Sequence, residues 1–272
     1  MSSKRVLFLL LSVCLFFVFV PSVNAQVLYA DFGVDYTQNF DSLASSSNNA
    51  TFTWTDNLTI VGWYSSRTIY RVGAGTVTNG DLYSFGASGD SDRALGSIGS
   101  NATGTIQYGV DIQNKTGATI SQVTLSYTGE QWRDGGGATA VPNTLTFAYS
   151  IDATSLTSGT YTNYSALSFT GPKNSQGTAA ALNGNASDNR ISLSSTITGL
   201  SLAPGSDLWL RWSDPNDTGN DHGIAIDDLR FSARPAAAVA TTPEPGLPAL
   251  FSGLILSGFG VLRSFRRSRR IA

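Results

Sequence analysis

Short stretches of alternating apolar and polar residues, separated by turn residues, fill most of this chain and constrain its fold more than any other feature. In residues 207–212, Leu208, Leu210 and Trp212 share one face, and Ile224 and Ile226 do the same in a later stretch. Such alternation is typical of antiparallel strands with one buried face. Gly, Asn, Asp and Ser lie between the stretches, and helical periodicity is almost absent. The sequence therefore predicts an all-β fold.

The number and spacing of these stretches indicate the architecture. Eleven segments read as strands, at residues 50–54, 57–63, 68–72, 81–85, 104–113, 119–129, 143–151, 164–169, 190–200, 206–212 and 223–231. No fixed repeat period appears, which argues against a propeller or a solenoid. We expect one two-sheet antiparallel β-sandwich of jelly-roll, lectin-like type over residues 26–234.

The first 25 residues have the pattern of a secretory signal peptide. Lys4 and Arg5 precede an apolar run at 6–20, and small residues follow Pro21, so cleavage is expected between Ala25 and Gln26. A retained membrane anchor is the alternative. Because the single cysteine lies within this segment, the mature chain has no disulfide and depends on its core, with help from bound ions.

The other end of the chain has three parts in order. Residues 235–245 form a linker rich in Ala, Thr and Pro, residues 246–262 are apolar, and residues 263–272 are rich in Arg. Seventeen apolar residues are at the short limit for a transmembrane helix, and basic residues beside such a helix are typical of a cytoplasmic flank. A permanent membrane anchor is the simplest interpretation.

Pro243, Glu244 and Pro245, followed by one helix with small residues and an Arg cluster, resemble the PEP-CTERM sorting signal. The resemblance implies recognition by an exosortase, a membrane protease of bacteria that make exopolysaccharide and biofilm. It also implies an inner-membrane intermediate in a Gram-negative-type bacterium. The product would then be released or attached at the cell surface or in the extracellular matrix.

Charge and composition exclude several function classes. Residues 26–235 contain 18 acidic and 10 basic residues, a formal charge of −8, which argues against binding nucleic acid. His222 is the only histidine, the mature chain has no thiol, and no Gly-x-Ser-x-Gly motif is present. Glu130 is the only Glu in this region, so no pair of glutamates marks a glycosidase. The sequence predicts a protein that is not an enzyme.

Two segments resemble the first and last strands of MAM-type and related extracellular jelly-roll domains. The segment like the first strand is QNFDSL at 38–43, and the segment like the last strand is GIAIDDLRFS at 223–232, while VGWY at 61–64 resembles a Gly-Trp that follows the first strand. The resemblance implies that these strands lie side by side and hold a structural calcium ion through Asp41 and Asp227, with Asp228 as the alternate. Carboxylate oxygens suit calcium. The cysteines of MAM domains are absent, so only the sandwich is supported, and a salt bridge or a turn cap is the alternative role for these acids.

Sugar recognition requires aromatic rings beside Asp, Asn and Arg, because sugars present apolar faces and hydroxyl edges. Trp132, Arg133 and Asp134 fit best, since they end a strand and precede a Gly-rich loop. The polar stretch at 213–229 starts like a calcium loop but lacks the closing Glu, and it reads as a long turn. The other tryptophans of the domain are expected in the core, namely Trp54, Trp63, Trp209 and Trp212.

These observations predict an exported, non-catalytic module that binds extracellular polysaccharide. Two alternatives stay open. One is a structural or adhesive matrix protein that binds another protein or itself, for which an exposed edge strand would be evidence. The other is a glycan-active enzyme, which would depend on Glu130.

Overall fold

The computed structural model describes residues 26–236. The expected signal peptide, the transmembrane helix and the sorting motif at 243–245 lie outside these residues. Within 26–236 the only helical segments are two short 3₁₀ turns, η1 (Ser165–Leu167) and η2 (Ser187–Asn189). No helix in this part of the chain has the length and apolar character needed to cross a membrane.

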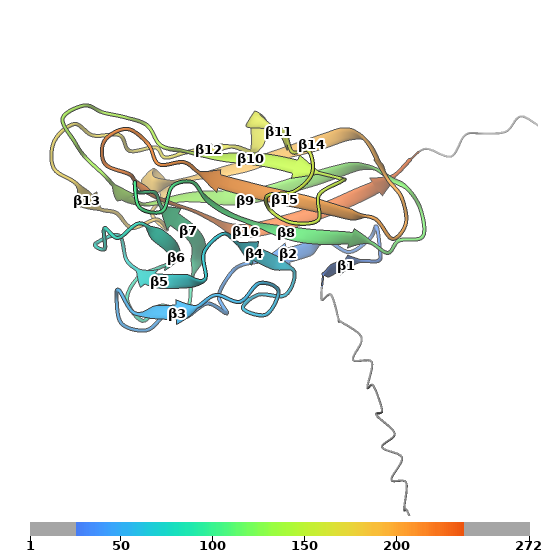
Figure 1. Ribbon diagram of the computed structural model, residues 1–272, viewed down its shortest axis with the longest axis horizontal. Helices are drawn as coiled ribbons and strands as arrows, with labels where there is room; N and C mark the ends of the chain where they lie inside the picture. Colours follow the sequence, from blue (N-terminus) through green and yellow to red (C-terminus); the bar gives the residue numbers. More distant parts are fainter. Residues whose placement is uncertain (1–25, 237–272) are drawn as a thin grey trace, which may run out of the picture. The chain divides into compact units, whose positions relative to one another are not determined.

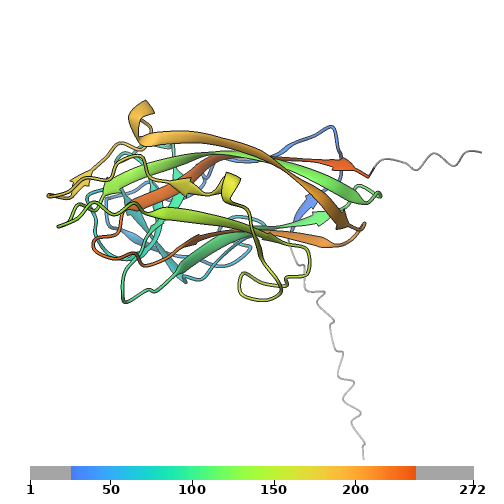
Figure 2. The same cartoon turned by 90° about the horizontal axis from the view of Figure 1, so that it is seen from above.

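Two β-sheets face each other, as the view from above shows (Figure 2), so the predicted β-sandwich is confirmed. The seven-stranded sheet runs, in spatial order, through β1 (Val27–Tyr29), β8 (Ile106–Asn114), β15 (Asp207–Asp214), β10 (Thr144–Ser150) and β11 (Thr162–Asn163), with β4 (Trp63–Ser65) on β8 and β12 (Phe169–Thr170) on β10. The nine-stranded sheet runs through β13 (Ala180–Ala181), β9 (Ile120–Asp134), β16 (Gly223–Pro235), β7 (Ala94–Ile98), β6 (Asp81–Phe85), β5 (Ile69–Gly73) and β3 (Thr51–Thr53), with β14 (Arg190–Leu202) on β9 and β2 (Tyr36–Gln38) on β16.

Most strand pairs are antiparallel, but two are parallel, β1 with β8 and β5 with β6. These two pairs are the exceptions to the antiparallel arrangement among the described strands. Strand β16 also extends to Pro235, one residue into the expected linker.

The core lies between the sheets and is centred on Trp212. Its indole is 5.9 Å from the ring of Trp63 and 5.1 Å from that of Phe147. The alternating apolar residues of β9, β15 and β16 all point into this layer. All four tryptophans predicted to be core are buried. Trp209, however, packs on the outer face of the seven-stranded sheet, under Ala153 and Leu156.

Strand β16 changes partner partway along its length. Residues 223–226 pair with β7, whereas Leu229 to Phe231 pair with β2. Between these segments Asp228 has φ +50°, and the register with β9 shifts. The bulge interrupts the ladder at this point, where Asp227 is buried and Asp228 is exposed. The pairing of β2 with β16 confirms that the segments around residues 38 and 228 lie side by side.

Candidate functional site

A polar pocket of about 320 Å³ lies where β9 ends and β16 begins. Figure 1 places the β15–β16 loop at the end of the sandwich away from β1 and from the last residues of β16. The lining comes from the turn after β7, the end of β9 and the loop joining β15 to β16. Its longer polar side chains are those of Asn101, Arg133, Asn216, Asn220 and Asp221. Guanidinium, carboxylate and carboxamide groups together offer both donors and acceptors of hydrogen bonds.

The β15–β16 loop is ordered by its own acids. The backbone N–H of Asp217 donates to Asp221 Oδ1 at 2.8 Å. The buried carboxamide of Asn143 donates to Asp217 Oδ2 and, at 3.5 Å, to Asp221 Oδ1. Burial raises the pKa of both carboxyl groups, and these hydrogen bonds oppose the rise in part. The loop is therefore a fixed wall of the pocket.

Donors and acceptors remain free on this wall. Asn216 Nδ2 donates to Asn101 Oδ1 at 3.0 Å, and Asn220 Nδ2 donates to the carbonyl of Gly135 at 3.1 Å. Arg133 Nη1 donates to the carbonyl of Gly75 at 3.1 Å. Each of these bonds uses one end of its side chain. The Oδ1 atoms of Asn216 and Asn220 and the other N–H groups of Arg133 can therefore serve a ligand.

Two glycines allow the segments around the pocket to approach this closely. A Cβ atom on Gly135 would lie 2.3 Å from the carbonyl oxygen of Asn220. On Gly99 it would lie 2.8 Å from Asp221 Oδ1 and 2.9 Å from the carbonyl oxygen of Pro215. Neither position has room for a side chain, so the width of the pocket depends on both glycines.

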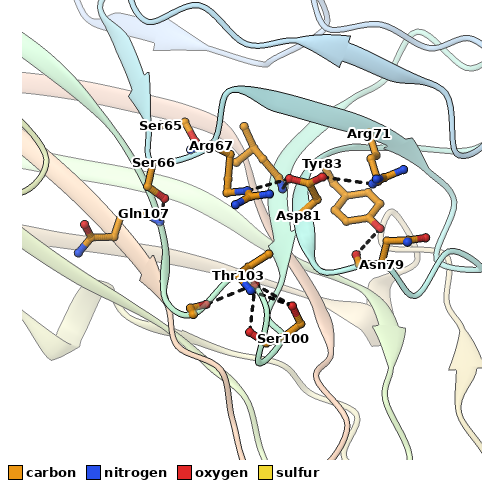
Figure 3. A network of polar contacts seen from close by, with 12 residues as sticks. Ser65, Ser66, Arg67, Arg71, Asn79, Asp81, Tyr83, Ser100, Thr103 and Gln107 are labelled. Carbon is orange, nitrogen blue, oxygen red and sulfur yellow. Dashed lines mark hydrogen bonds and ion pairs between the residues drawn. The ribbon is translucent and has the colours of Figure 1, made fainter.

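A network of polar contacts around Asp81 supports one side of the pocket (Figure 3). Buried Asp81 binds Arg67 Nε at 2.9 Å and Arg71 Nε at 3.2 Å. Nearby, the Tyr83 hydroxyl donates to the carbonyl of Asn79 at 2.6 Å. Asp81 opposes Ile98, a pocket residue, in the β6–β7 ladder. These bonds fix the segments that carry Thr78 and Ser100, which also line the pocket.

Behind the pocket lies a buried group around the only histidine. Gln131 Nε2 is 2.6 Å from His222 Nδ1, and His222 Nε2 is 3.8 Å from Asp134 Oδ1. Burial lowers the pKa of His222 more than Asp134 and Asp217 raise it. Burial also opposes ionisation of Asp134, but hydrogen bonds from Gly136 and Ser175 lower its pKa. The buried imidazole of His222 is therefore neutral, and the carboxylate of Asp134 accepts hydrogen bonds. Both side chains support the β15–β16 loop, and neither lines the pocket.

Of the three residues predicted to bind a sugar, the structure brings only Arg133 to the pocket. Trp132 is 2% exposed, stacks on Phe85 and donates from Nε1 to Glu130 Oε2 at 2.9 Å. Asp134 is buried as described above. The expected aromatic platform at Trp132 is therefore not exposed. Glu130, on which an enzyme would depend, is also buried and does not line this pocket.

The three acids predicted to bind calcium lie near the bulge of β16. Asp41 Oδ1 accepts the backbone N–H of Arg93 at 3.0 Å, and Asp41 Oδ2 accepts Asn39 Nδ2 at 2.6 Å. Asp227 Oδ1 accepts the backbone N–H of Asp228 at 2.7 Å. Over residues 26–236, no three His, Cys, Asp or Glu side chains are arranged as a metal site. The acids occupy one region without converging on one point.

Asp227 shares this region with Glu130. Asp227 is 4% exposed, and burial, then Glu130, Asp228 and Asp92, raise its pKa to about 9. Burial raises the pKa of Glu130 to about 7, although its bond from Trp132 opposes the rise. At neutral pH the Asp227 carboxyl favours a proton, or a cation, over the bare charge, whereas Glu130 titrates close to neutral pH.

A second, more open groove of about 790 Å³ follows β2 and β16 beside this acidic region. Its polar lining includes Gln38, Asn39, Ser126, Asp228 and Arg230. Within the groove, Gln38 Oε1 accepts the backbone N–H of Phe40 at 2.7 Å. The one ion pair next to it joins Arg230 to Asp35 at 3.0 Å, and Arg230 is 65% exposed.

Sequence reasoning found part of the pocket. It singled out Arg133 and the polar stretch at 213–229, but it interpreted that stretch as a simple turn. The segments at Thr78 and at 98–101 carried no signal, because their residues are small and unremarkable in sequence. Only the pairing of β6, β7, β9 and β16 brings these segments to one place.

No family model matches the chain, and no curated protein matches it. Solved structures with a similar arrangement include the CBM22-2 xylan-binding domain of Paenibacillus barcinonensis Xyn10C. It is 15% identical, with 73% of this chain and 99% of that chain covered and a TM-score of 0.38.

Two further structures are similar at the same level. The xylan-binding module CBM15 is 11% identical, with 70% and 99% of the two chains covered and a TM-score of 0.33. TmCBM61, in complex with β-1,4-galactotriose, is 9% identical, with 63% and 88% covered and a TM-score of 0.29. Similarity this low does not identify the ligand of this chain, so its candidate site is defined by its own side chains.

Proposed function

We propose that residues 26–236 form a non-catalytic module that binds extracellular polysaccharide in the pocket around Arg133. The observation that carries this proposal is the convergence of Arg133, Asp221, Asn216 and Asn220 on one fixed cavity, with donors and acceptors left free. Sugar hydroxyl groups both donate and accept hydrogen bonds, so they match such a lining.

The size and character of the pocket limit the ligand. About 320 Å³ is near the lower end for ligand pockets and suits one sugar residue at a chain end or branch more than a long run of residues. No aromatic ring belongs to the described lining, contrary to the expectation from sequence that a sugar site contains one, so hydrogen bonds rather than stacking would supply the affinity. We expect weak binding, which several copies on one surface would strengthen.

A glycan array tests this proposal. The chain from Gln26 to Ala272, kept in mild detergent, should bind a defined set of neutral glycans, and Asp221→Asn should weaken every positive signal. The matched control is Asp188→Asn, in η2 and outside the described pocket lining. Binding that survives Asp221→Asn unchanged would move the site elsewhere, and no binding to any glycan would reject the proposal.

We also propose that the chain is exported and sorted by an exosortase through Pro243, Glu244 and Pro245. Support comes from the order of the three parts at the C-terminal end of the sequence, of which only residues 235 and 236 belong to the described part of the chain. Intact mass of the protein from its own organism, by cell fraction, tests this. A product from Gln26 to near Pro245 is expected, and a product that still ends at Ala272 in the inner membrane would contradict it.

A structural calcium ion near Asp41, Asp227 and Asp228 remains part of the proposal. Its support is the buried carboxyl of Asp227, whose pKa is raised by burial and then by Glu130, Asp228 and Asp92. A bound ion would offset their repulsion and stabilise the fold. Calcium should raise the melting temperature of the chain at pH 8, and Asp227→Asn should remove the effect. The idea fails if calcium leaves the melting temperature of the chain unchanged.

A second candidate function, self-association in a matrix, rests on β14. This 13-residue strand pairs only with β9 among the described strands and carries no charge after Arg190. Unpaired, uncharged edges favour pairing with another chain. The Tyr164 hydroxyl, however, donates to the Thr196 carbonyl at 2.9 Å and covers part of the edge. Sedimentation of the chain tests this function by its oligomeric state. A dimer that Ser194→Lys dissociates would favour the function, and a monomer would exclude it.

A further inference from the structure

Asp111 is a buried carboxyl that no cation accompanies in the described structure. It lies on β8, on the outer face of the seven-stranded sheet, and is 3% exposed. Its Oδ1 atom has no hydrogen-bond partner, and it forms no ion pair within residues 26–236. Burial, and then Asp207, raise its pKa to about 7, while a hydrogen bond from the Gln26 side chain opposes the rise. A buried acceptor in this state is costly.

The strand pairing places Gln26 next to this carboxyl. Strand β1 runs parallel to β8, with Val27 opposite Ile112. One residue back in the same register, Gln26 lies beside Asp111. Val27 and Ile112 both point into the core, so the side chains of Gln26 and Asp111 are both on the outer face, where the Gln26 side chain bonds to the Asp111 carboxyl.

The backbone at this point is held in place by Gly62. This glycine has φ +79°, and a Cβ atom on it would lie 2.6 Å from Val27 Cγ2 and 2.9 Å from Val27 N. Its carbonyl also accepts the backbone N–H of Asp111 at 2.9 Å. Residues 26 and 27 therefore have a fixed position against β8.

We infer that Asp111 is the acceptor for the α-ammonium group that forms on Gln26 when the chain is cut between Ala25 and Gln26. The inference uses the predicted cleavage site and is independent of polysaccharide binding. In the cut, water adds across the peptide bond: the C–N bond breaks, the hydroxyl goes to the carbonyl carbon of Ala25, and the Gln26 nitrogen gains a proton. At neutral pH that nitrogen is an ammonium with three donors.

No other cation of the described structure fills this role. The nearest acid, Asp207, adds negative charge. Arg211, on the neighbouring strand, is occupied elsewhere: its Nη1 donates to the Leu156 carbonyl at 2.7 Å, and its guanidinium carbon lies 3.6 Å from the centre of the Tyr161 ring. Before cleavage the backbone nitrogen of Gln26 is a neutral amide, and after cleavage it carries a charge in addition to the side-chain donor. Removal of the signal peptide thus completes the fold.

The test compares two forms of the chain from Gln26 to Ala272 in mild detergent. One starts with the free amine of Gln26, released by a protease that leaves no extra residue, and the other has two added glycines. We expect the free-amine form to melt about 3 °C higher, the shift for roughly 1 kcal/mol in a domain of this size. In Asp111→Asn the two forms should melt together, whereas in the control Asp207→Asn the difference should persist.

Three results would overturn the inference. They are equal melting of the two forms, a difference that persists in Asp111→Asn, and equal stability after the amine cyclises to neutral pyroglutamate, which mass spectrometry detects. Both termini are prepared in vitro, so the outcome does not depend on where the organism cuts the chain. It also does not depend on glycan binding.

Discussion

Two acidic regions lie at neighbouring parts of β16, and their carboxyl groups differ in the hydrogen bonds that they accept. In the loop before the strand, Asp217 and Asp221 receive hydrogen bonds from Asn143 and the backbone and stand beside an open pocket. At the bulge, Asp227 is buried near Glu130, and the pKa values of the two rise to about 9 and about 7. The first region offers hydrogen-bond donors and acceptors beside a cavity. The second favours a proton or a cation.

This difference teaches that acidic composition alone does not indicate a metal site. From sequence, only the bulge is a calcium candidate, by resemblance, whereas the loop starts like a calcium loop, lacks the closing Glu and is interpreted as a turn. What separates them is the supply of donors. Asn143, Asn216 and Asn220 accompany the loop, whereas the bulge has few donors and several acids.

The largest effect is expected from Gly135→Ala in the pocket. The new Cβ would overlap the Asn220 carbonyl oxygen, at 2.3 Å, and push the β15–β16 loop away. Overpacking of this kind costs about 1–3 kcal/mol of stability, and we expect glycan binding to fall by at least tenfold. Gly33→Ala is the control, because the nearest atom to its Cβ would be 3.3 Å away. Equal binding by the Gly135 variant would separate the loop from the function.

The next effect concerns pH and the bulge. The folded-state pKa of Asp227, about 9, exceeds the value of about 4 in an unfolded chain, so the folded chain binds more protons between these values. Unfolding free energy therefore falls as pH rises from about 4 to about 9. Asp227→Asn should flatten this slope and raise the melting temperature at pH 8 by several degrees, at about 2–4 °C per kcal/mol.

Thermal melts in calcium-free buffer from pH 5 to pH 8 measure this slope. The matched control is Asp228→Asn, since Asn tolerates the positive φ of +50° at that position. It should keep most of the slope. A slope unchanged in Asp227→Asn would show that the burial of this carboxyl does not control stability.

A smaller effect is expected from Asn216→Ala. The change removes one amide from the pocket and its 3.0 Å bond to Asn101. A single hydrogen bond contributes about 1 kcal/mol, so glycan affinity should fall about threefold to tenfold while the melting temperature hardly changes. Asn163→Ala, on exposed β11, serves as the control in the same titration. A loss larger than that for Gly135→Ala would contradict the ranking.

Local patterning predicted the strands with clear alternation and failed where burial is two-sided or turns intervene. Strand β7 (Ala94–Ile98) was missed because it is buried on both faces and its small residues do not alternate. Residues 57–63 were predicted as a strand, but Asn57 at φ +63° and Gly62 at φ +79° make a turn there. The segment at 164–169 was predicted as one strand, yet it forms η1 and then β12.

The candidate site was predictable only in part for the same reason. Arg133 follows from its place at the end of a strand, next to glycines. From sequence, Trp132 could be exposed or buried, because the residues that cover it lie about 50 positions later in the chain. Leu182 donates its backbone N–H to the Trp132 carbonyl, and a Cβ atom on Gly184 would lie 2.3 Å from Trp132 Nε1. Contacts at this sequence separation leave no local pattern.

The most direct measurement is a calorimetric titration of the chain with the best glycan from the array, beside Arg133→Ala and the control Arg230→Ala. Loss of a charged hydrogen-bond donor costs about 1.5–3 kcal/mol, so the Arg133 variant should bind roughly tenfold to a hundredfold more weakly with an unchanged fold. Arg230→Ala should bind like the parent chain. Full affinity in Arg133→Ala, or a loss confined to Arg230→Ala, would contradict the account and place the ligand in the groove along β2 and β16.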